Sequence, residues 1–288
     1  MTSLRRLLSR PEIVVAPGAY DSLTARLVEH AGFPAVYLTG AGVSYSALGQ
    51  PDLGLISFAE MAERATRVVQ AVGIPVIADA DTGYGGPLNV VRTVREYERA
   101  GVAAIQLEDQ TLPKRCGHLA RKALVSAEEM CGKIEAACWA RANPDTVIIG
   151  RTDARDVEGL EAALDRARRY AAAGAELVFV EAPESADELA RIAAEFPGAA
   201  MANLVEGGKT PSLPVARLQG LGFRLVIFPN LLTRVMAKAA LEALAALALS
   251  GTTAELASRM LSFTELNRLL GLEDLLDLAD RFSKETHS

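Results

Sequence analysis

The stretch YERAGVAAIQLED, residues 97–109, contains the pattern that decides the fold of this chain. A segment with helical spacing ends at Ala100-Gly101, and glycine is expected after a last helical turn because it accepts a left-handed backbone. A short apolar run follows and is closed by Glu108 and Asp109. Such a run is too short for a helix and is typical of a strand that is buried on both faces of a parallel sheet.

The same pattern recurs along the whole chain. Its instances are EIVVAPGAYD (12–21), GFPAVYLTG (32–40), GIPVIADADTG (73–83), GVAAIQLED (101–109), TVIIGRTD (146–153), GAELVFVEAP (174–183), GAAMANLVEGG (198–208) and GFRLVIFPN (222–230). Segments with helical spacing lie between them, at residues 22–31, 58–71, 87–100, 127–141, 157–173, 186–195, 213–220 and 231–249. Eight strands alternating with eight helices predict an α/β fold, a (β/α)8 TIM barrel. A doubly wound open sheet is the alternative, although the Gly-x-Gly-x-x-Gly motif expected after its first strand is missing.

The end of the chain exceeds what a barrel needs. We expect a single barrel domain over residues 1–288, with extra C-terminal helices in the tail from about residue 252 to 282. The leucine spacing of this tail suits helices that pack on the same chain or on a second subunit. We therefore expect the helices of residues 231–288 to lie at a subunit interface.

Composition and charge argue against several classes of partner. The formal net charge is −6, the pI is about 5.3 and no dense block of lysine and arginine occurs, so we expect no nucleic-acid or membrane partner. No run approaches the roughly 18 apolar residues of a membrane span, and the N-terminus lacks the apolar segment of a secretory signal. The three cysteines, Cys116, Cys131 and Cys138, cannot all pair and lack zinc-binding spacing. These features predict a reduced, cytoplasmic protein.

Polar residues close most of the predicted strands. At the carboxyl ends of barrel strands such residues converge on one mouth, where the chemistry of these folds sits. Any one of them alone more often only marks where a strand stops, but scattered loop polarity would include more lysine and serine. In strand order they are Thr39 and Gly40, Asp79 and Asp81, Glu108 and Asp109, Arg151 and Asp153, Glu181, Asn203, and Pro229 and Asn230.

Several carboxylates in one mouth repel one another unless a cation neutralises them. Mg²⁺, with Mn²⁺ as the alternative, prefers oxygen ligands, keeps bound waters and leaves room for a substrate oxygen. Asp79, Asp81 and Glu108 are therefore predicted metal-site residues, with Asp52 as a fourth. The planar guanidinium of Arg151 suits a substrate carboxylate. The predicted substrate is an anionic oxyacid that chelates the metal through adjacent oxygens.

The connection of residues 110–125 contains proline and glycine and is long enough to act as a lid. Within it, Cys116 stands beside Lys114, Arg115 and His118, and cationic neighbours lower the pKa of a thiol. A thiol that titrates near neutrality transfers a proton efficiently. We therefore predict that Cys116 is an acid carried by the lid, with an inert exposed thiol as the alternative.

At these residues the sequence resembles the isocitrate lyase and phosphoenolpyruvate mutase superfamily. PKRCGH (113–118) is similar to the family's KKCGH or KRCGH signature, and ADADTGYGG (78–86) to its metal-binding strand. The motifs YLTGAG (37–42), LGQPDLG (48–54), QLEDQ (106–110), GRTDA (150–154), VFVEAP (179–184) and ANLVEGGKTP (202–211) also follow the family's order and spacing. The resemblance covers about residues 5–270 and is nearest to the methylisocitrate lyase and 2,3-dimethylmalate lyase branch.

The resemblance implies a (β/α)8 barrel whose last helix is exchanged between the subunits of a homotetramer. It also implies an Mg²⁺-dependent reaction on a small carboxylate, with Cys116 as the proton donor. Asp79 is the implied direct metal ligand, assisted by Asp52, Asp81 and Glu108. At the substrate carboxylate the resemblance implies Thr39, Gly40 and Ala41 with Arg151, and at the substrate hydroxyl it implies Tyr37. Glu108 and His118 are implied members of the catalytic group. The residues implied to bind the rest of the substrate are Lys114, Arg115 and Gly117 beside it and Glu181 and Asn203 at its distal end.

Two departures from the family pattern bear on the substrate. Thr39-Gly40-Ala41 stands where members often have Ser-Gly-Gly or Ser-Gly-Trp, so the shape of the pocket can differ. Asn203-Leu-Val-Glu-Gly-Gly stands where methylisocitrate lyases usually read like Asn-Ile-Thr-Glu-Phe-Gly, which favours dicarboxylates such as 2,3-dimethylmalate over a tricarboxylate.

The sequence thus predicts a carbon–carbon lyase that cleaves a 2-hydroxy di- or tricarboxylate, of the 2,3-dimethylmalate or 2-methylisocitrate type, to a 2-oxo acid such as pyruvate and a second carboxylate. Three alternatives stay open. The first is a carboxyphosphonoenolpyruvate or phosphoenolpyruvate phosphonomutase, and the second is an oxaloacetate hydrolase or decarboxylase. The third is a non-catalytic barrel used for binding or assembly.

Overall fold

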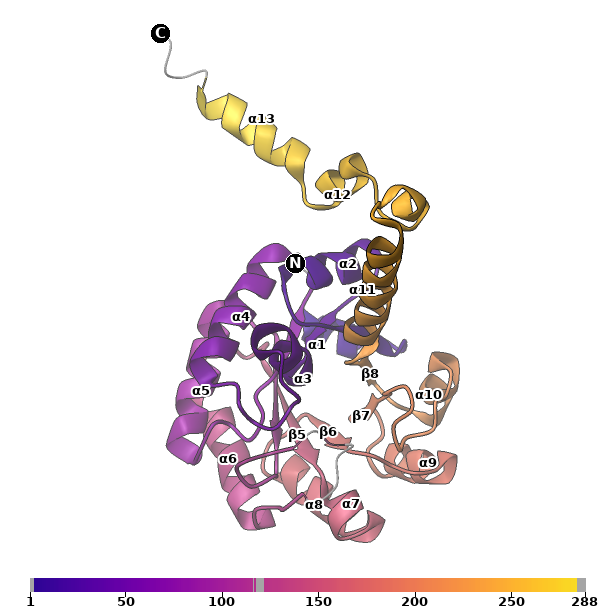
Figure 1. Cartoon of the computed structure of the whole chain (residues 1–288). Helices are drawn as coiled ribbons and strands as arrows, with labels where there is room; N and C mark the ends of the chain where they lie inside the picture. Colours follow the sequence, from indigo (N-terminus) through magenta and orange to yellow (C-terminus); the bar gives the residue numbers. More distant parts are fainter. Residues whose placement is uncertain (1–2, 116, 118–121, 284–288) are drawn as a thin grey trace. The chain divides into compact units, whose positions relative to one another are not determined.

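The computed structural model describes residues 3–115, 117 and 122–283, so the predicted residues Cys116 and His118 lie outside the described part. Eight parallel strands form a closed barrel in which each strand pairs with the next and β8 pairs with β1 (Figure 1). This confirms the predicted barrel and excludes the open sheet. The strands are β1 (Val14–Ala19), β2 (Val36–Leu38), β3 (Val76–Asp79), β4 (Ala104–Glu108), β5 (Val147–Thr152), β6 (Leu177–Val180), β7 (Ala200–Asn203) and β8 (Leu225–Phe228).

Helices follow the strands where the sequence predicts them. Four of them begin at a side-chain cap, at Asp21, Ser57, Ser126 and Ser185, and Gly101 ends its helix with φ +88°. The predicted segment 157–173 forms one helix over Leu160–Ala172, which begins after Gly159 with φ +92°, and a short helix over Ala154–Val157 precedes it. The helices are α2 (Ser22–His30), α4 (Phe58–Ala71), α5 (Pro87–Ala100), α6 (Ala127–Ala140), α7 (Ala154–Val157), α8 (Leu160–Ala172), α9 (Ala186–Glu195), α10 (Val215–Leu221) and α11 (Leu231–Ser250).

Short elements that the sequence pattern did not indicate complete the barrel. The helix α1 (Leu4–Leu8) contributes Leu4 and Leu7 to the apolar cluster of the barrel interior, next to Val14 at the start of β1. The helix α3 (Gly40–Val43) begins at the N-cap Thr39 and runs into a π-helical turn (Ser44–Leu48). The TGAG motif after β2 is therefore a helix start.

The apolar core has two layers, set by the alternation of side chains along each strand. In β6, Phe179 joins the cluster inside the barrel, whereas Val178 and Val180 join the layer between the sheet and its helices. Inside the barrel, Phe179 packs in one cluster with Ile77 and Met201, all at most 1% exposed. Burying each such side chain contributes about 1.5–3 kcal/mol. Because the interior is filled, the polar groups gather at the carboxyl ends of the strands.

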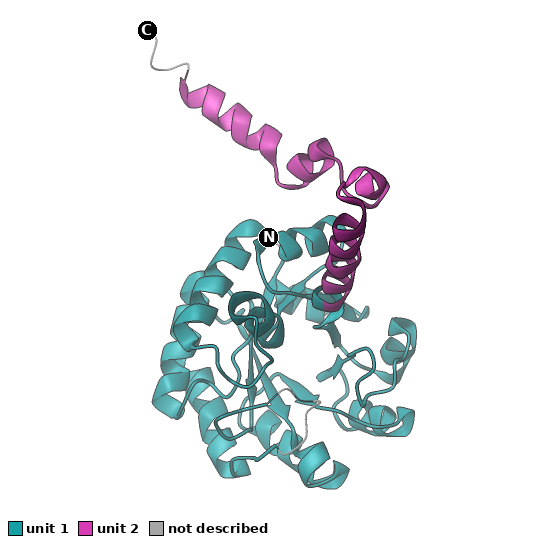
Figure 2. Cartoon of the chain, viewed as in Figure 1, with its two compact units in different colours: residues 1–233 teal, residues 234–288 magenta. Residues whose placement is uncertain are grey.

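The chain divides into two compact units, residues 1–233 and 234–288 (Figure 2). The first contains the barrel. The second contains most of α11, a 3₁₀ helix (Ala254–Arg259), α12 (Phe263–Leu269) and α13 (Leu272–Ser283). No residue of α11, α12 or α13 is buried, and large apolar side chains such as Leu249, Phe263 and Leu275 are more than 60% exposed. Within the described residues, no helix combines the length and apolar character that a membrane crossing requires.

Candidate active site at the carboxyl ends of the strands

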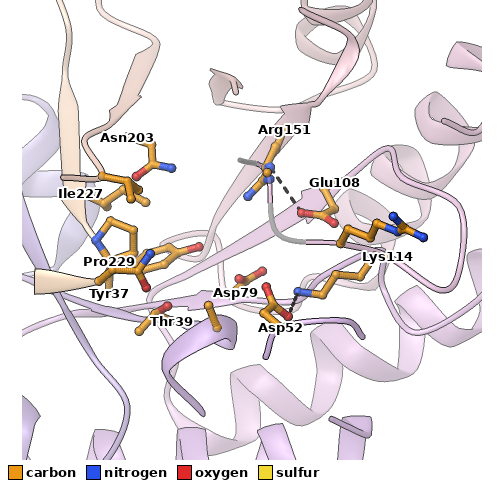
Figure 3. Close-up of a pocket in the computed structure, with 15 residues that line it drawn as sticks. Tyr37, Thr39, Asp52, Asp79, Glu108, Lys114, Arg151, Asn203, Ile227 and Pro229 are labelled. Carbon is orange, nitrogen blue, oxygen red and sulfur yellow. Dashed lines mark hydrogen bonds and ion pairs between the residues drawn. The ribbon is translucent and has the colours of Figure 1, made fainter. Parts of the chain in front are cut away.

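Side chains from six of the barrel strands and their loops line one polar pocket (Figure 3). Most of the described residues that the sequence predicted for the site are found there. Gly40, Asp81 and Glu181 contact the lining residues directly, as shown below. The lining residues are Tyr37, Thr39, Ala41, Asp52, Asp79, Glu108, Lys114, Arg115, Gly117, Arg151, Asn203, Val205, Ile227, Pro229 and Asn230.

Gly40 brings the start of α3 against the acid at the end of β3. Its backbone N–H points at Asp79 Oδ2 from 3.4 Å, and Thr39 Oγ1 accepts the N–H of Gly42 at 3.3 Å. A β-carbon at residue 40 would lie 2.9 Å from Asp79 Oδ2. A β-carbon at residue 40 would therefore force Asp79 or the start of α3 to move. Asp79 Oδ1 also accepts the backbone N–H of Asp81 at 3.0 Å.

Lys114 joins two of the predicted metal-site acids. Its Nζ lies 2.6 Å from Asp52 Oδ1 and 2.8 Å from Asp81 Oδ1, and all three side chains are at least 90% buried. Burial raises the pKa of Asp81 to about 6, although the Lys114 ammonium opposes the shift. Burial lowers the pKa of Lys114, but the acids around it outweigh that effect and raise it well above its usual value. Lys114 is thus a fixed positive charge among the acids.

Arg151 lies among three carboxylates. Its Nε and Nη2 donate to the two oxygens of Asp153 at 2.9 and 3.1 Å. Nε lies 3.3 Å from Glu108 Oε2, and Nη2 lies 3.3 Å from Glu181 Oε2. Burial raises the pKa of Glu108 well above its usual value, with Arg151 opposing the shift. The guanidinium is therefore oriented before any substrate carboxylate arrives.

The distal end of the pocket is held by an amide. Asn203 Nδ2 donates to both carboxylate oxygens of Glu181, at 3.3 and 3.1 Å. On the other side, the Tyr37 hydroxyl donates to Gln106 Oε1 at 3.2 Å inside the barrel. Burial raises the pKa of Tyr37 well above its usual value, and the charge of Asp79 adds to the effect. Tyr37 is therefore a neutral phenol that can donate a hydrogen bond but cannot serve as a base.

Asp109, which the sequence placed with the residues of the mouth, instead belongs to a buried polar layer and does not line the pocket. Asp109 is fully buried and accepts from Thr152 Oγ1 and the Tyr170 hydroxyl, each at 2.7 Å, and from the Asp153 N–H at 2.9 Å. The two-residue period of a strand could have indicated this, because adjacent residues face opposite ways. If Glu108 faces the pocket, then Asp109 must face away from it. Lys122 is also buried, and its Nζ lies 3.0 Å from Asp153 Oδ1. Nothing in the sequence around Lys122 indicated this partner.

The acids at the rim can be tested for their fit to a metal ion. Among the described residues, no group of three histidine, cysteine, aspartate or glutamate side chains is arranged to hold a metal ion by itself. Glu108 Oε1 is buried and has no hydrogen-bond partner in the described structure, whereas Asp52 and Asp81 are both paired with the single ammonium of Lys114. A hard cation that takes one or two carboxylate oxygens, and the rest of its ligands from water and substrate, fits this arrangement.

Comparison with known proteins places these residues in a family context. The family model for phosphoenolpyruvate phosphomutase matches residues 4–248. The chain is 50% identical to the 2,3-dimethylmalate lyase of Eubacterium barkeri, over 97% of both chains. It is 46% identical to the 2-methylisocitrate lyase of Aeropyrum pernix, over 94% of this chain and 87% of that protein.

Solved structures agree with the sequence relatives. Oxaloacetate acetylhydrolase in complex with 3,3-difluorooxalacetate superposes with a TM-score of 0.93 at 37% identity, over 98% of this chain and 96% of that one. Phosphonopyruvate hydrolase in complex with oxalate and Mg²⁺ superposes with a TM-score of 0.87 at 32% identity, over 97% of both chains.

Proposed function

The chain belongs to the phosphoenolpyruvate mutase/isocitrate lyase superfamily, and from this premise we propose that it is a carbon–carbon lyase acting on a 2-hydroxy dicarboxylate of the 2,3-dimethylmalate type. The observation that carries the proposal is one pocket that joins Arg151, the Thr39 helix start and the acids around Asp79. These groups suit a substrate with a carboxylate next to a hydroxyl. The names of the relatives at 50% and 46% identity support the same reaction class.

Binding begins at the 2-hydroxy-carboxylate end of the substrate. Arg151 is oriented by Asp153, and its guanidinium supplies the bidentate donors that a carboxylate prefers. The backbone of Thr39, Gly40 and Ala41 faces the same space and completes this subsite. The substrate hydroxyl then lies towards Tyr37, which remains protonated and orients it by a hydrogen bond.

Cleavage breaks the C2–C3 bond after the hydroxyl gives its proton to one of the carboxylates that line the pocket. The hydroxyl oxygen becomes the carbonyl of a 2-oxo acid, and the bonding electrons move to C3, which leaves as the enolate of the second acid. A proton delivered to C3 completes the reaction, so that 2,3-dimethylmalate yields pyruvate and propionate. Cys116 is our candidate donor for this proton, because the loop that carries it contributes Lys114, Arg115 and Gly117 to the pocket.

We propose that Asp79 holds Mg²⁺, or alternatively Mn²⁺, with Asp52, Asp81 and Glu108 assisting directly or through water. When bound, the cation supplies positive charge that lowers the free energy of the dianion formed during cleavage. An Mg²⁺–oxalate complex of a structural relative supports this assignment, since oxalate is also a small chelating diacid. The buried Glu108 Oε1, which has no hydrogen-bond partner among the described residues, supports it from within this chain.

A dicarboxylate fits the distal end of the pocket better than a tricarboxylate does. The side chains there are the Glu181–Asn203 pair together with Val205, Ile227 and Pro229. A third carboxylate placed there would meet the charge of Glu181 and apolar carbons, which disfavour an anion. Methyl groups on C2 and C3 would instead contact those carbons.

A substrate panel with Mg²⁺ tests the proposal. Release of pyruvate from 2,3-dimethylmalate, 2-methylisocitrate and other 2-hydroxy diacids would be followed with coupled lactate dehydrogenase. Loss of oxaloacetate and of phosphonopyruvate would be followed directly, because hydrolysis of the first and rearrangement of the second release no pyruvate. We expect the highest kcat/KM for an alkyl-substituted malate. Turnover of oxaloacetate or phosphonopyruvate alone would assign the chain to the hydrolase or mutase alternative. Absence of turnover and of Mg²⁺–oxalate binding would leave the non-catalytic alternative.

We further propose that residues 231–288 form the interface of a homotetramer in the cytoplasm. The exposed leucines and phenylalanines of α11, α12 and α13 support this, because apolar surface of this extent marks a contact with another chain. Light scattering on the purified protein tests the tetramer. A monomer at micromolar concentration would contradict it.

A further inference from the structure

Lys122 is a buried lysine that takes no part in the proposed chemistry. It contacts two groups that lie next to Arg151, the carboxylate of Asp153 and the backbone of Gly117. The Lys122 side chain is 0% exposed, and its Nζ lies 3.0 Å from Asp153 Oδ1 and 3.5 Å from Asp156 Oδ2. The same ammonium donates to the carbonyl of Gly117. Burying an ammonium is costly unless it is paired and hydrogen-bonded. Packing alone does not explain Lys122, because an apolar residue of similar size avoids this cost.

The first of these two groups is the carboxylate that orients Arg151. Arg151 Nη2 and Lys122 Nζ both donate to Asp153 Oδ1, while Arg151 Nε donates to Oδ2. Both cations therefore bind the same buried carboxylate. Without Lys122, the Asp153 carboxylate would keep only Arg151 as a hydrogen-bond partner among the described side chains, and Arg151 is also attracted to Glu108 and Glu181. The orientation of the guanidinium thus depends on Lys122 through Asp153.

The second group is the backbone of Gly117. A β-carbon on Gly117 would lie 2.6 Å from Glu181 Cγ and Cδ and would also overlap Arg151 Nη2. The backbone of Gly117 therefore lies directly against the Arg151–Glu181 pair. Lys122 holds this backbone through the Gly117 carbonyl, five residues earlier in the chain. A single ammonium thus contacts both the Asp153 carboxylate that orients Arg151 and the Gly117 backbone that lies against Arg151.

We propose that Lys122 is a positioning residue of this site, whose ammonium holds the Gly117 backbone against Arg151 and fixes Arg151 through Asp153. The inference rests on the proposed lyase function for its kinetic test. Its binding test requires only that Arg151 contributes to the binding of a small carboxylate.

The experiment compares Lys122→Met with Lys209→Met in the full-length protein. Lys209 is a matched control because it pairs with Asp156 on the other side, and its side chain is 33% exposed. For Lys122→Met we expect kcat at saturating substrate to fall about 10²-fold, the usual effect of a displacement on the order of 1 Å in a positioned group. We expect oxalate binding in the presence of Mg²⁺ to weaken about tenfold by calorimetry, and both quantities to stay within about twofold in Lys209→Met.

Two further variants separate positioning from a structural role. Lys122→Gln keeps a donor for the Gly117 carbonyl without the charge, and it replaces Lys122→Met if that variant does not fold. In a double-mutant cycle with Asp153→Asn, the combined variant should lose no more activity than the worse single variant, because both act on Arg151 by one route. A structural role alone predicts a lower Tm with kcat unchanged per folded molecule.

The binding arm distinguishes failure of this inference from failure of the proposed function. If the wild-type protein cleaves none of the tested diacids, the lyase assignment fails, and the oxalate comparison still decides the role of Lys122. The inference is overturned if a folded Lys122 variant binds oxalate as tightly as Lys209→Met does. Additive losses in the double-mutant cycle would also contradict it.

Discussion

Replacing Gly40 by alanine tests how closely α3 must approach the acid at the end of β3. The added β-carbon would lie 2.9 Å from Asp79 Oδ2, about 0.5 Å short of the 3.4 Å at which ordinary contact begins. Either the carboxylate or the start of α3 must therefore move by about that distance. Misplacement by about 1 Å costs on the order of 10²-fold in rate, so we expect kcat to fall about tenfold, or about 1.4 kcal/mol of transition-state stabilisation.

The same substitution should leave the fold intact. Gly40 does not have a left-handed backbone, and alanine is favoured over glycine in a helix. Steady-state kinetics would measure kcat, calorimetry the affinity for Mg²⁺ with oxalate, and thermal denaturation the Tm. We expect weaker Mg²⁺ binding with a Tm equal to or above that of the wild type.

Gly132→Ala is the control, because Gly132 lies within α6 with no atom within 4 Å of its added β-carbon. It should raise the free energy of unfolding by about 1 kcal/mol and leave the kinetics unchanged. The reasoning is refuted if Gly40→Ala retains wild-type turnover and Mg²⁺ affinity, since Asp79 would then tolerate displacement or play no part in metal binding.

Three further substitutions address the remaining groups. Cys116→Ser should lower kcat about 10²–10⁴-fold while oxalate binding by calorimetry stays unchanged, and near-normal turnover would remove the thiol from the mechanism. Arg151→Lys should lower kcat/KM about 10²-fold, because an ammonium cannot reproduce the planar contacts of the guanidinium with several carboxylates. Steady-state kinetics on the preferred diacid would measure this loss, and an unchanged kcat/KM would exclude bidentate binding of the substrate by Arg151. Asp109→Asn should lower the free energy of unfolding, measured by urea denaturation, by about 1–3 kcal/mol, because the buried hydroxyls of Thr152 and Tyr170 lose an acceptor oxygen. An unchanged unfolding midpoint would show that this buried polar layer does not stabilise the barrel.

The sequence by itself determined the barrel and the identity of most pocket residues. Strand and helix periods are local properties, and glycine caps such as Gly101 mark the change from one to the other. Parallel strands joined by helices also bring their carboxyl ends to one rim. Residues as distant as Thr39 and Asn203 could therefore be predicted to share a site.

Only the tertiary structure decided which partner each charge takes. Lys114 lies 62 residues from Asp52 in the chain, yet its ammonium bridges Asp52 and Asp81, a pairing that the sequence did not indicate. Lys122 reads as a loop charge, but its Nζ is buried between Asp153 and the carbonyl of Gly117. The physical reason is that an ion pair depends on the distance between two side chains after the barrel has closed, and no local pattern encodes that distance.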